Sequence, residues 1–327
     1  MTIKRVLIIA PLFLILFLLQ SYLWVPTYEQ QTRGNPARLH EYIAASSGDA
    51  SLLNPILSSD TTSGHIGSLV FESLIDRDEE LRFRGRLATS WEVFEEAFFY
   101  VNESAGIPSM GKASPQELVE FLMQAKTKKG VSNPKVKASL DNIREISLIP
   151  PMKFTVTKSE NATIENKEKI QVKVHVRAPA RVKLSLTRVD QDLFHSLTQL
   201  LGRNYFSSFG GEEFLNTEPQ VGRKKLVLYA TELLPATEHN PVLVFHLRPD
   251  VQFHDGHIFD AFDVKFTYES IMNPRNLSPR IADYEPVKAV EVIDPLTIRI
   301  IYKRLYSPAL GTWGMGIIPE HLLNQEA

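Results

Sequence analysis

The stretch VLVFHLRPDVQFHDGHIFDAFDVKFTYESIM, residues 242–272, decides the fold, because it predicts a strand, a tight turn and a helix in that order. Its first residues alternate between apolar and other side chains, with Leu243, Phe245 and Leu247 on one face. A period of two over this length is typical of a half-buried strand. We therefore expect a sheet here, followed by a helix with one buried face.

The middle of this stretch carries turn and cap signals. Asp255 and Gly256 have the spacing of a hairpin turn, which needs a positive φ that Gly and Asp tolerate best. Asp260 precedes a run with helical apolar spacing, and Asp263 follows three residues later. We expect Asp260 to cap the helix and Asp263 to lie beside the positive end of its dipole.

The same residues raise the alternative of a metal site. His254, Asp255 and His257, with His246 nearby, are possible zinc ligands, but a hairpin turn lacks the helical spacing of proven zinc motifs. The sequence also contains no nucleophile elbow, phosphate loop or dinucleotide-binding motif. We therefore expect a structural turn and no metal, cofactor or catalytic residue. A metallohydrolase built on these histidines is the alternative, and it would contain a bound metal.

Composition narrows the class of protein. The 327 residues suggest about two domains, and 43% hydrophobic residues provide ample core material. The formal net charge of -2 shows no basic excess, so no nucleic-acid partner is expected. Cysteine is absent, which excludes disulfides, Cys-ligated zinc, thiol catalysis and a lipid anchor on cysteine.

The N-terminus predicts export. Lys4 and Arg5 precede an apolar run from Val6 to Val25, so residues 1–27 are expected to be a signal peptide or a membrane anchor. No small-x-small cleavage site follows the run, which favours an uncleaved anchor formed by residues 6–25. The rest of the chain would then lie outside the cytoplasm, in the periplasm or an equivalent space. A buried core helix is the alternative.

Residues 94–241 predict an inserted α+β module. A helix is expected from Ser114, a second at residues 133–146 and a third at residues 190–202. Between them, residues 153–157, 169–178 and 181–189 alternate with a period of two, which indicates antiparallel strands. Before the module, a helix is expected from Ser63 and a strand around Trp91.

An ordered set of motifs resembles the bacterial extracellular solute-binding proteins of family 5, the peptide and nickel receptors of ABC importers. The matching segments are LNPIL at 53–57, LVFESLID at 69–76, LATSWEV at 87–93, the stretch 244–274, VIDPLTIRI at 292–300 and GIIPEHLL at 316–323. Two departures from the family pattern stand out: Ser73 occupies a position where the family usually has glycine, and the block between the LATSWEV strand and residue 242 is far longer than usual.

The resemblance implies an α/β fold of the type II periplasmic-binding-protein kind, in which two lobes close on a ligand. It implies a start of the solute-binding lobe and accessory subdomain at 37–93, the inserted module at 94–241, and a continuation of the subdomain with a return to the first lobe at 242–327. On this view the fold is incomplete, with the second lobe absent.

The resemblance also implies where a ligand binds. The loop Ser59 to Ser63 and the segment Thr312 to Met315 correspond to cleft walls, which makes Ser59, Thr62, Ser63, Trp313, Gly314 and Met315 the candidate ligand-binding residues. Trp313 would offer an aromatic face, and the alternative is a tryptophan packed in the core. Asp255, Gly256, Asp260, Asp263 and Trp91 would serve only as scaffold.

The expected function is capture of oligopeptides or a similar small solute outside the cytoplasmic membrane, for delivery to an ABC permease and its ATPase, with no catalysis. An envelope interaction or signalling protein on a receptor scaffold is the alternative. The inserted module motivates it.

Overall fold

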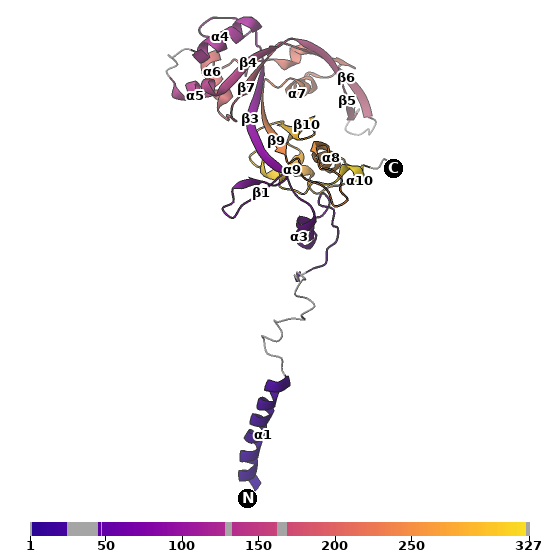
Figure 1. Cartoon of the computed structure of the whole chain (residues 1–327). Coiled ribbons are helices and arrows are strands. Elements are labelled where there is room, and N and C mark those ends of the chain that lie inside the picture. Colours follow the sequence, from indigo (N-terminus) through magenta and orange to yellow (C-terminus); the bar gives the residue numbers. More distant parts are fainter. Residues whose placement is uncertain (1, 25–44, 47, 128–132, 162–168, 325–327) are drawn as a thin grey trace. The chain divides into compact units, whose positions relative to one another are not determined.

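The computed structural model covers the whole chain and describes every residue except 1, 25–44, 47, 128–132, 162–168 and 325–327 (Figure 1). The chain divides into two units, Met1–Asp49 and Ala50–Ala327. Residues 37–44, where the first lobe is expected to begin, lie outside the described residues.

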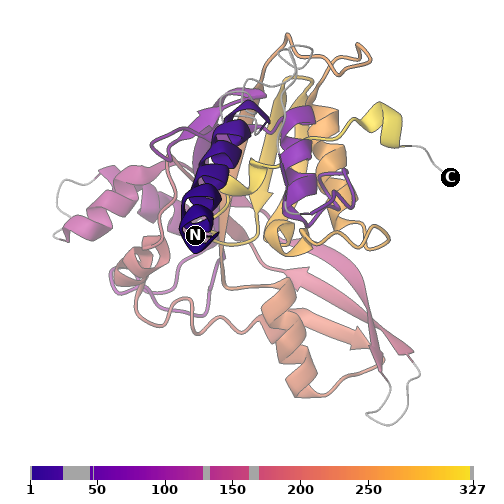
Figure 2. The ribbon, with the colours of Figure 1, turned by 90° about the horizontal axis from the view of Figure 1, so that it is seen from below.

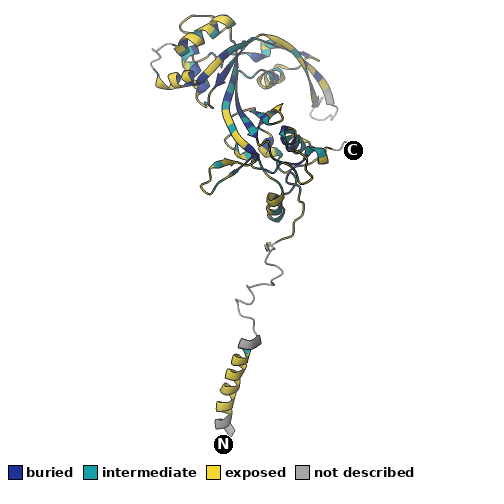
Figure 3. Ribbon diagram, in the orientation of Figure 1, coloured by how far each residue is buried: buried dark blue, intermediate teal, exposed yellow. Residues whose placement is uncertain are grey.

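The first unit contains one described helix, α1 (Thr2–Trp24). Its apolar side chains between Val6 and Leu19 are exposed (Figure 3). Within the described ranges, no helix combines the length and the apolar character needed to cross a membrane. The membrane anchor expected at residues 6–25 stays a prediction.

The second unit is built on an antiparallel sheet of six strands in the order β10-β11-β9-β3-β7-β4. The strands are β3 (Ala88–Tyr100), β4 (Ile143–Ile149), β7 (Arg181–Leu186), β9 (Thr237–Leu247), β10 (Val287–Asp294) and β11 (Thr297–Tyr302). β3 and β9 form the central pair and stay in register from Ser90 opposite His246 to Phe99 opposite Thr237. The expected module boundaries, at Phe94 and Pro241, both lie inside this continuous pair.

Two smaller sheets are formed by the other described strands. β5 (Met152–Asn161), β6 (Lys169–Ala178) and β8 (Leu215–Glu218) form one, and β1 (Ile75–Arg77) with β2 (Phe83–Gly85) forms the other. Helix α7 (Arg223–Leu233) lies against the β5–β6 hairpin, where Tyr229 and Ala230 are buried with Val172 and Val174 (Figure 2).

The remaining helices mostly follow the sequence signals. They are α3 (Thr61–Val70), α4 (Pro115–Thr127), α5 (Pro134–Asn142), α6 (Leu193–Leu201), α8 (Ala261–Met272), α9 (Ile281–Tyr284) and α10 (Glu320–Leu323), with short 3-10 turns η2 (Gly211–Phe214) and η3 (Gly311–Trp313). The chain is therefore a mixed α/β protein, and the predicted class is confirmed. The helix predicted at 133–146 was wrong in its last turn, because Ile143 begins strand β4 and pairs with β7.

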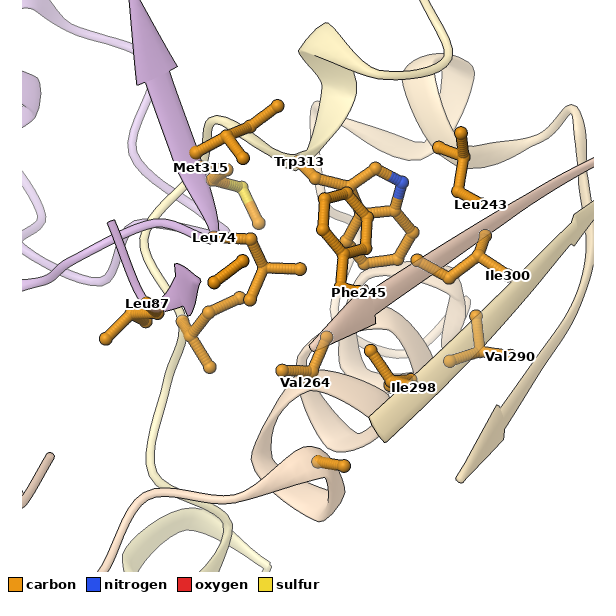
Figure 4. Packing of buried hydrophobic residues seen from close by; sticks show 14 of the residues in the cluster. Leu74, Leu87, Leu243, Phe245, Val264, Val290, Ile298, Ile300, Trp313 and Met315 are labelled. Atoms are coloured by element: carbon orange, nitrogen blue, oxygen red, sulfur yellow. The ribbon is translucent and has the colours of Figure 1, made fainter. Parts of the chain in front are cut away.

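The described residues of the second unit form three apolar cores. One joins residues from 56–88 to residues from 243–318, with Leu74, Phe245 and Trp313 near its centre (Figure 4). The other two consist entirely of residues between Ala97 and Leu234. The expected module thus has cores of its own, although it shares the central strand pair with the rest of the unit.

Candidate functional site

A pocket of about 570 Å³ opens beside the first core. Its wall is made by the loop at Pro55 and Ser58, one side of α3, the segment that follows α3, and residues 306–316 around η3. These segments are far apart in sequence. An antiparallel bridge between Ser73 and Gly316, together with a 2.8 Å hydrogen bond from the Ile317 N–H to the Glu72 carbonyl, holds two of them side by side.

Helix α3 begins with a tightly bonded cap. The Asp60 carboxylate accepts hydrogen bonds from the Ser63 N–H, at 2.7 Å, and from the Ser51 hydroxyl. These bonds hold the pKa of the Asp60 carboxyl well below its usual range, and the bond from the Ser51 hydroxyl is the largest single cause. The Ser63 hydroxyl in turn accepts the N–H groups of Ser51 and Leu52. The buried Ser63 is thus a structural residue that ties the preceding loop to α3.

The predicted site loop lies close to the pocket but does not line it. Ser59 is exposed and Thr62 is half-buried, and the pocket lining includes neither of them nor Ser63. The residues that line it here are Ser58 on one side and Gly64, Gly67 and Ser68 of α3 on the other. The run SGHIGS carried a usable signal, since small residues three apart on a helix leave one face open.

Two of the three residues named for the second predicted wall line this pocket. Gly314 and Met315 line the pocket, whereas Trp313 is only 1% exposed. The Trp313 indole Nε1 donates to the Tyr302 hydroxyl at 3.1 Å, and its ring meets Tyr284 edge-on with centroids 5.4 Å apart. Trp313 therefore belongs to the core, the alternative that the sequence left open.

The two tyrosines around Trp313 keep this wall rigid. The Tyr284 hydroxyl donates to the Thr312 carbonyl at 2.9 Å, and the Tyr302 hydroxyl donates to the Ala309 carbonyl at 2.8 Å. Burial raises the pKa of both phenols. Both tyrosines thus stay neutral and act as fixed hydrogen-bond donors to the backbone behind the pocket.

Close backbone contact also shapes this wall. A Cβ at Gly316 would lie 2.7 Å from the Cβ of Phe71, so only glycine fits there without a shift. A Cβ at Gly314 would lie 3.2 Å from the Gly311 carbonyl oxygen. A side chain at Gly316 would therefore push apart the two segments that meet here.

Most of the charges at the pocket are paired with one another. Arg86 pairs with Glu72 and, at 3.4 Å, with Asp76. Arg84 donates two hydrogen bonds to Asp76, which lowers the pKa of the Asp76 carboxyl. Two further charged residues, Arg280 and Asp283, also line the pocket.

The turn at Asp255 and Gly256 forms as expected and lies away from this pocket. Gly256 has φ of +90°, and the Phe253 N–H donates to the His257 carbonyl at 2.8 Å. The Asp255 carboxylate meets His321 Nε2 at 2.7 Å, which lowers the pKa of Asp255, and the His321 ring stacks on His257. Within the described ranges, no group of three or more His, Asp or Glu side chains is arranged to hold a metal ion.

The expected cap at the start of α8 is present. The Asp260 side chain accepts the Phe262 N–H at 2.8 Å, and Asp263 accepts the Asp260 N–H at 3.0 Å. Asp263 also accepts the Glu320 N–H at 2.9 Å, and burial raises the pKa of its carboxyl. These aspartates thus join α8 to α10. Trp91 is half-buried and packs at the margin of the first core.

A second, more apolar pocket of about 730 Å³ lies near the same turn. Its lining includes Leu69, Val70, Phe253 and Leu322, and it contains none of the predicted ligand-binding residues. The polar pocket beside Gly314 and Met315 is therefore the better candidate site.

Comparison with known proteins places this geometry in context. Residues 231–321 match the family model described as bacterial extracellular solute-binding proteins, family 5 Middle. A glutathione-binding protein, GsiB, of Salmonella paratyphi A is 39% identical over 61 residues, which cover 19% of this chain and 12% of that protein. The GsiB of Pectobacterium atrosepticum is 26% identical over 117 residues, which cover 36% of this chain and 21% of that protein. Residues 231–321 thus match the family that the sequence motifs resemble.

Among solved structures, the oligopeptide-binding protein AppA from Bacillus subtilis, in complex with a nonapeptide, aligns with 86% of this chain and 28% of its own. The identity is 14% and the TM-score 0.39. The chain thus spans between about a tenth and a third of the length of these relatives.

Proposed function

We propose that this chain captures a short peptide or similar small solute for an ABC importer. The premise is that residues 231–321 match the family 5 solute-binding proteins. The capture would take place outside the cytoplasmic membrane, with an ABC permease and ATPase as partners, and without catalysis. The observation that carries the proposal is the family match, which runs through β9, α8, β10, β11 and the wall at Gly314 and Met315.

The pocket chemistry supports this proposal. Glycines of α3 and of residues 311–316 line the pocket beside Ser58, Ser68 and Thr312. Small and hydroxyl-bearing side chains leave room and hydrogen-bonding groups for a peptide ligand whose own amides need partners. Arg86 pairs with Glu72 and Asp76, so this part of the lining is polar but carries little net charge. Such a lining contrasts with the concave, largely apolar sites that suit hydrophobic ligands.

The proposal is tested by ligand binding to the purified chain. The panel contains peptides of two to five residues, reduced glutathione and a nickel chelate, each measured by ligand-observed NMR and by thermal melting. A true ligand stabilises the native state by mass action, by about 2.7 kcal/mol at a hundredfold excess over Kd, and so raises the melting temperature. If no member of the panel binds at millimolar concentration, solute capture by this chain is refuted.

A blocking variant makes the test specific for this pocket. Gly64 lines the pocket, and a Cβ there would meet no atom within 4 Å. Gly64→Leu should therefore fill part of the pocket and weaken binding without disturbing the fold. Gly106→Leu is the matched control, since its Cβ also meets nothing and it lies outside the pocket lining.

The alternative function, envelope interaction or signalling, is motivated by the two cores formed between Ala97 and Leu234. Such a module has the internal packing to act as a separate interaction unit. The neighbouring genes discriminate the two functions: permease and ATPase genes support import, whereas a sensor kinase or envelope-assembly gene supports the alternative.

A further inference from the structure

Arg280 is held at the rim of the pocket by the loop that contains Pro55 and Ile56. Its N–H donates to the Ser278 hydroxyl at 3.2 Å, and that hydroxyl donates to the Ile56 carbonyl at 2.6 Å. Ser278 is buried, with 5% exposure. The backbone of Arg280 is thus fixed to the same loop that forms one wall of the pocket.

The Arg280 side chain is also positioned, but its charge is not balanced. Its Nε donates to the Pro55 carbonyl at 3.1 Å. In the part of the chain that the structure describes, no carboxylate lies within 4 Å of the Arg280 guanidinium, whereas Arg86 on the same pocket pairs with Glu72 and Asp76. A guanidinium has five N–H donors, so most of those of Arg280 stay open.

The residue Asp283 lies at the same rim and limits which anions fit. It lines the pocket, is exposed, and makes no ion pair within 4 Å among the described residues. Glu72 and Asp76 add two further carboxylates to the lining. A ligand with a single, planar negative group is therefore better suited to this pocket than a dianion, which would be repelled by these acids.

We propose that Arg280 is the residue that binds a carboxylate of the captured solute, in a bond that uses its two open Nη groups. This rests on the proposed function. The planar fork of a guanidinium matches a carboxylate in a two-point arrangement, and such charge-assisted bonds are about twice as strong as neutral ones. The solute class is thus a small peptide-like molecule with a free carboxylate.

The test compares trialanine as the free acid with trialanine as its C-terminal amide, by ligand-observed NMR on the purified chain. The free acid should bind wild type about 10- to 100-fold more tightly than the amide, as expected for a hydrogen bond to a charged group. Arg280→Gln should weaken the free acid to the level of the amide and leave the amide unchanged. Arg280→Lys, which keeps the charge and loses the fork, should give an intermediate loss.

Arg275→Gln is the matched control, because Arg275 is an exposed arginine of the same segment that does not line the pocket. It should leave both affinities unchanged. Equal binding of acid and amide to wild type would overturn the role of Arg280 and leave solute capture standing. If neither form binds, the proposed capture of peptides is overturned. If inorganic phosphate displaces the free acid as strongly as the free acid displaces itself, the assignment of Arg280 to a carboxylate is overturned.

Discussion

A change at Gly67 gives the sharpest test of the pocket geometry. Gly67 is buried in the interior of α3 and lines the pocket, yet a Cβ built there meets no atom within 4 Å. A glycine inside a helix costs about 0.8–1.0 kcal/mol relative to alanine. Gly67→Ala should therefore stabilise the protein by up to about 1 kcal/mol, with the methyl group entering empty pocket space.

The gain is measured by urea denaturation, as a rise in midpoint with an unchanged slope. A gain of 1 kcal/mol corresponds to a rise of about 2–4 °C in melting temperature for a unit of this size. Gly111→Ala is the control and should lower the stability, because Gly111 has φ of +75° and alanine is strained there. A loss of stability in Gly67→Ala would show that the space beside α3 is filled and that the pocket has been wrongly placed.

Three further outcomes follow from the described contacts. Asp260→Ala should cost about 1 kcal/mol in urea denaturation, because it removes the cap of α8, and an unchanged midpoint would contradict the capping role. Gly316→Ala should destabilise by more than 1 kcal/mol, since its Cβ would clash with Phe71, and a neutral effect would show that the two segments are further apart. The depressed pKa of Asp60 means that its stabilising contribution is present above about pH 4 and is lost as the pH falls towards its folded pKa. In the Asp60→Asn variant, the free energy of unfolding should fall less steeply than in wild type as the pH drops below about 4. An unchanged slope there would argue against the hydrogen bonds that Asp60 accepts.

Local rules account for the elements that the sequence predicted well. The strand at Leu243, Phe245 and Leu247, the positive φ at Gly256 and the cap at Asp260 all depend on residues within a few positions of one another. Alternation, turn chemistry and capping act over that range, so they can be read directly from the chain.

Ambiguous spacing explains the main error in the elements. Ile143 and Ile146 are three residues apart and so fit the apolar period of a helix that continues from α5. In β4 both are buried, because a register shift lies between Ile143 and Glu145. The pairing partner decided the outcome, because β7 lies alongside and bonds to residues 143–149. Helix α7 was not predicted, and its buried Tyr229 and Ala230 belong to a core that it shares with β6, a strand about 50 residues earlier.

The pocket itself depends on contacts between distant segments, which sequence reasoning cannot supply. Ser58 and Gly64 line the same pocket as Gly314, about 250 residues later, and the bridge between Ser73 and Gly316 is one of the contacts that join the two segments. Arg280 lies in a stretch without a recognisable motif, so nothing in the sequence marked it. Trp313 was ambiguous because its two hydrogen-bonding and stacking partners, Tyr302 and Tyr284, could not be identified without the fold.

The central strand pair sets how an engineered version without the module must be designed. Because β3 and β9 run side by side without a loop between the pocket-side core and the module cores, no flexible hinge exists at which to cut. The module has to be removed at a facing pair of residues, such as Val93 opposite Leu243, and a two-residue turn has to connect the two shortened strands. A cut at unmatched positions would shift the shortened hairpin by one residue and turn its apolar side chains towards solvent.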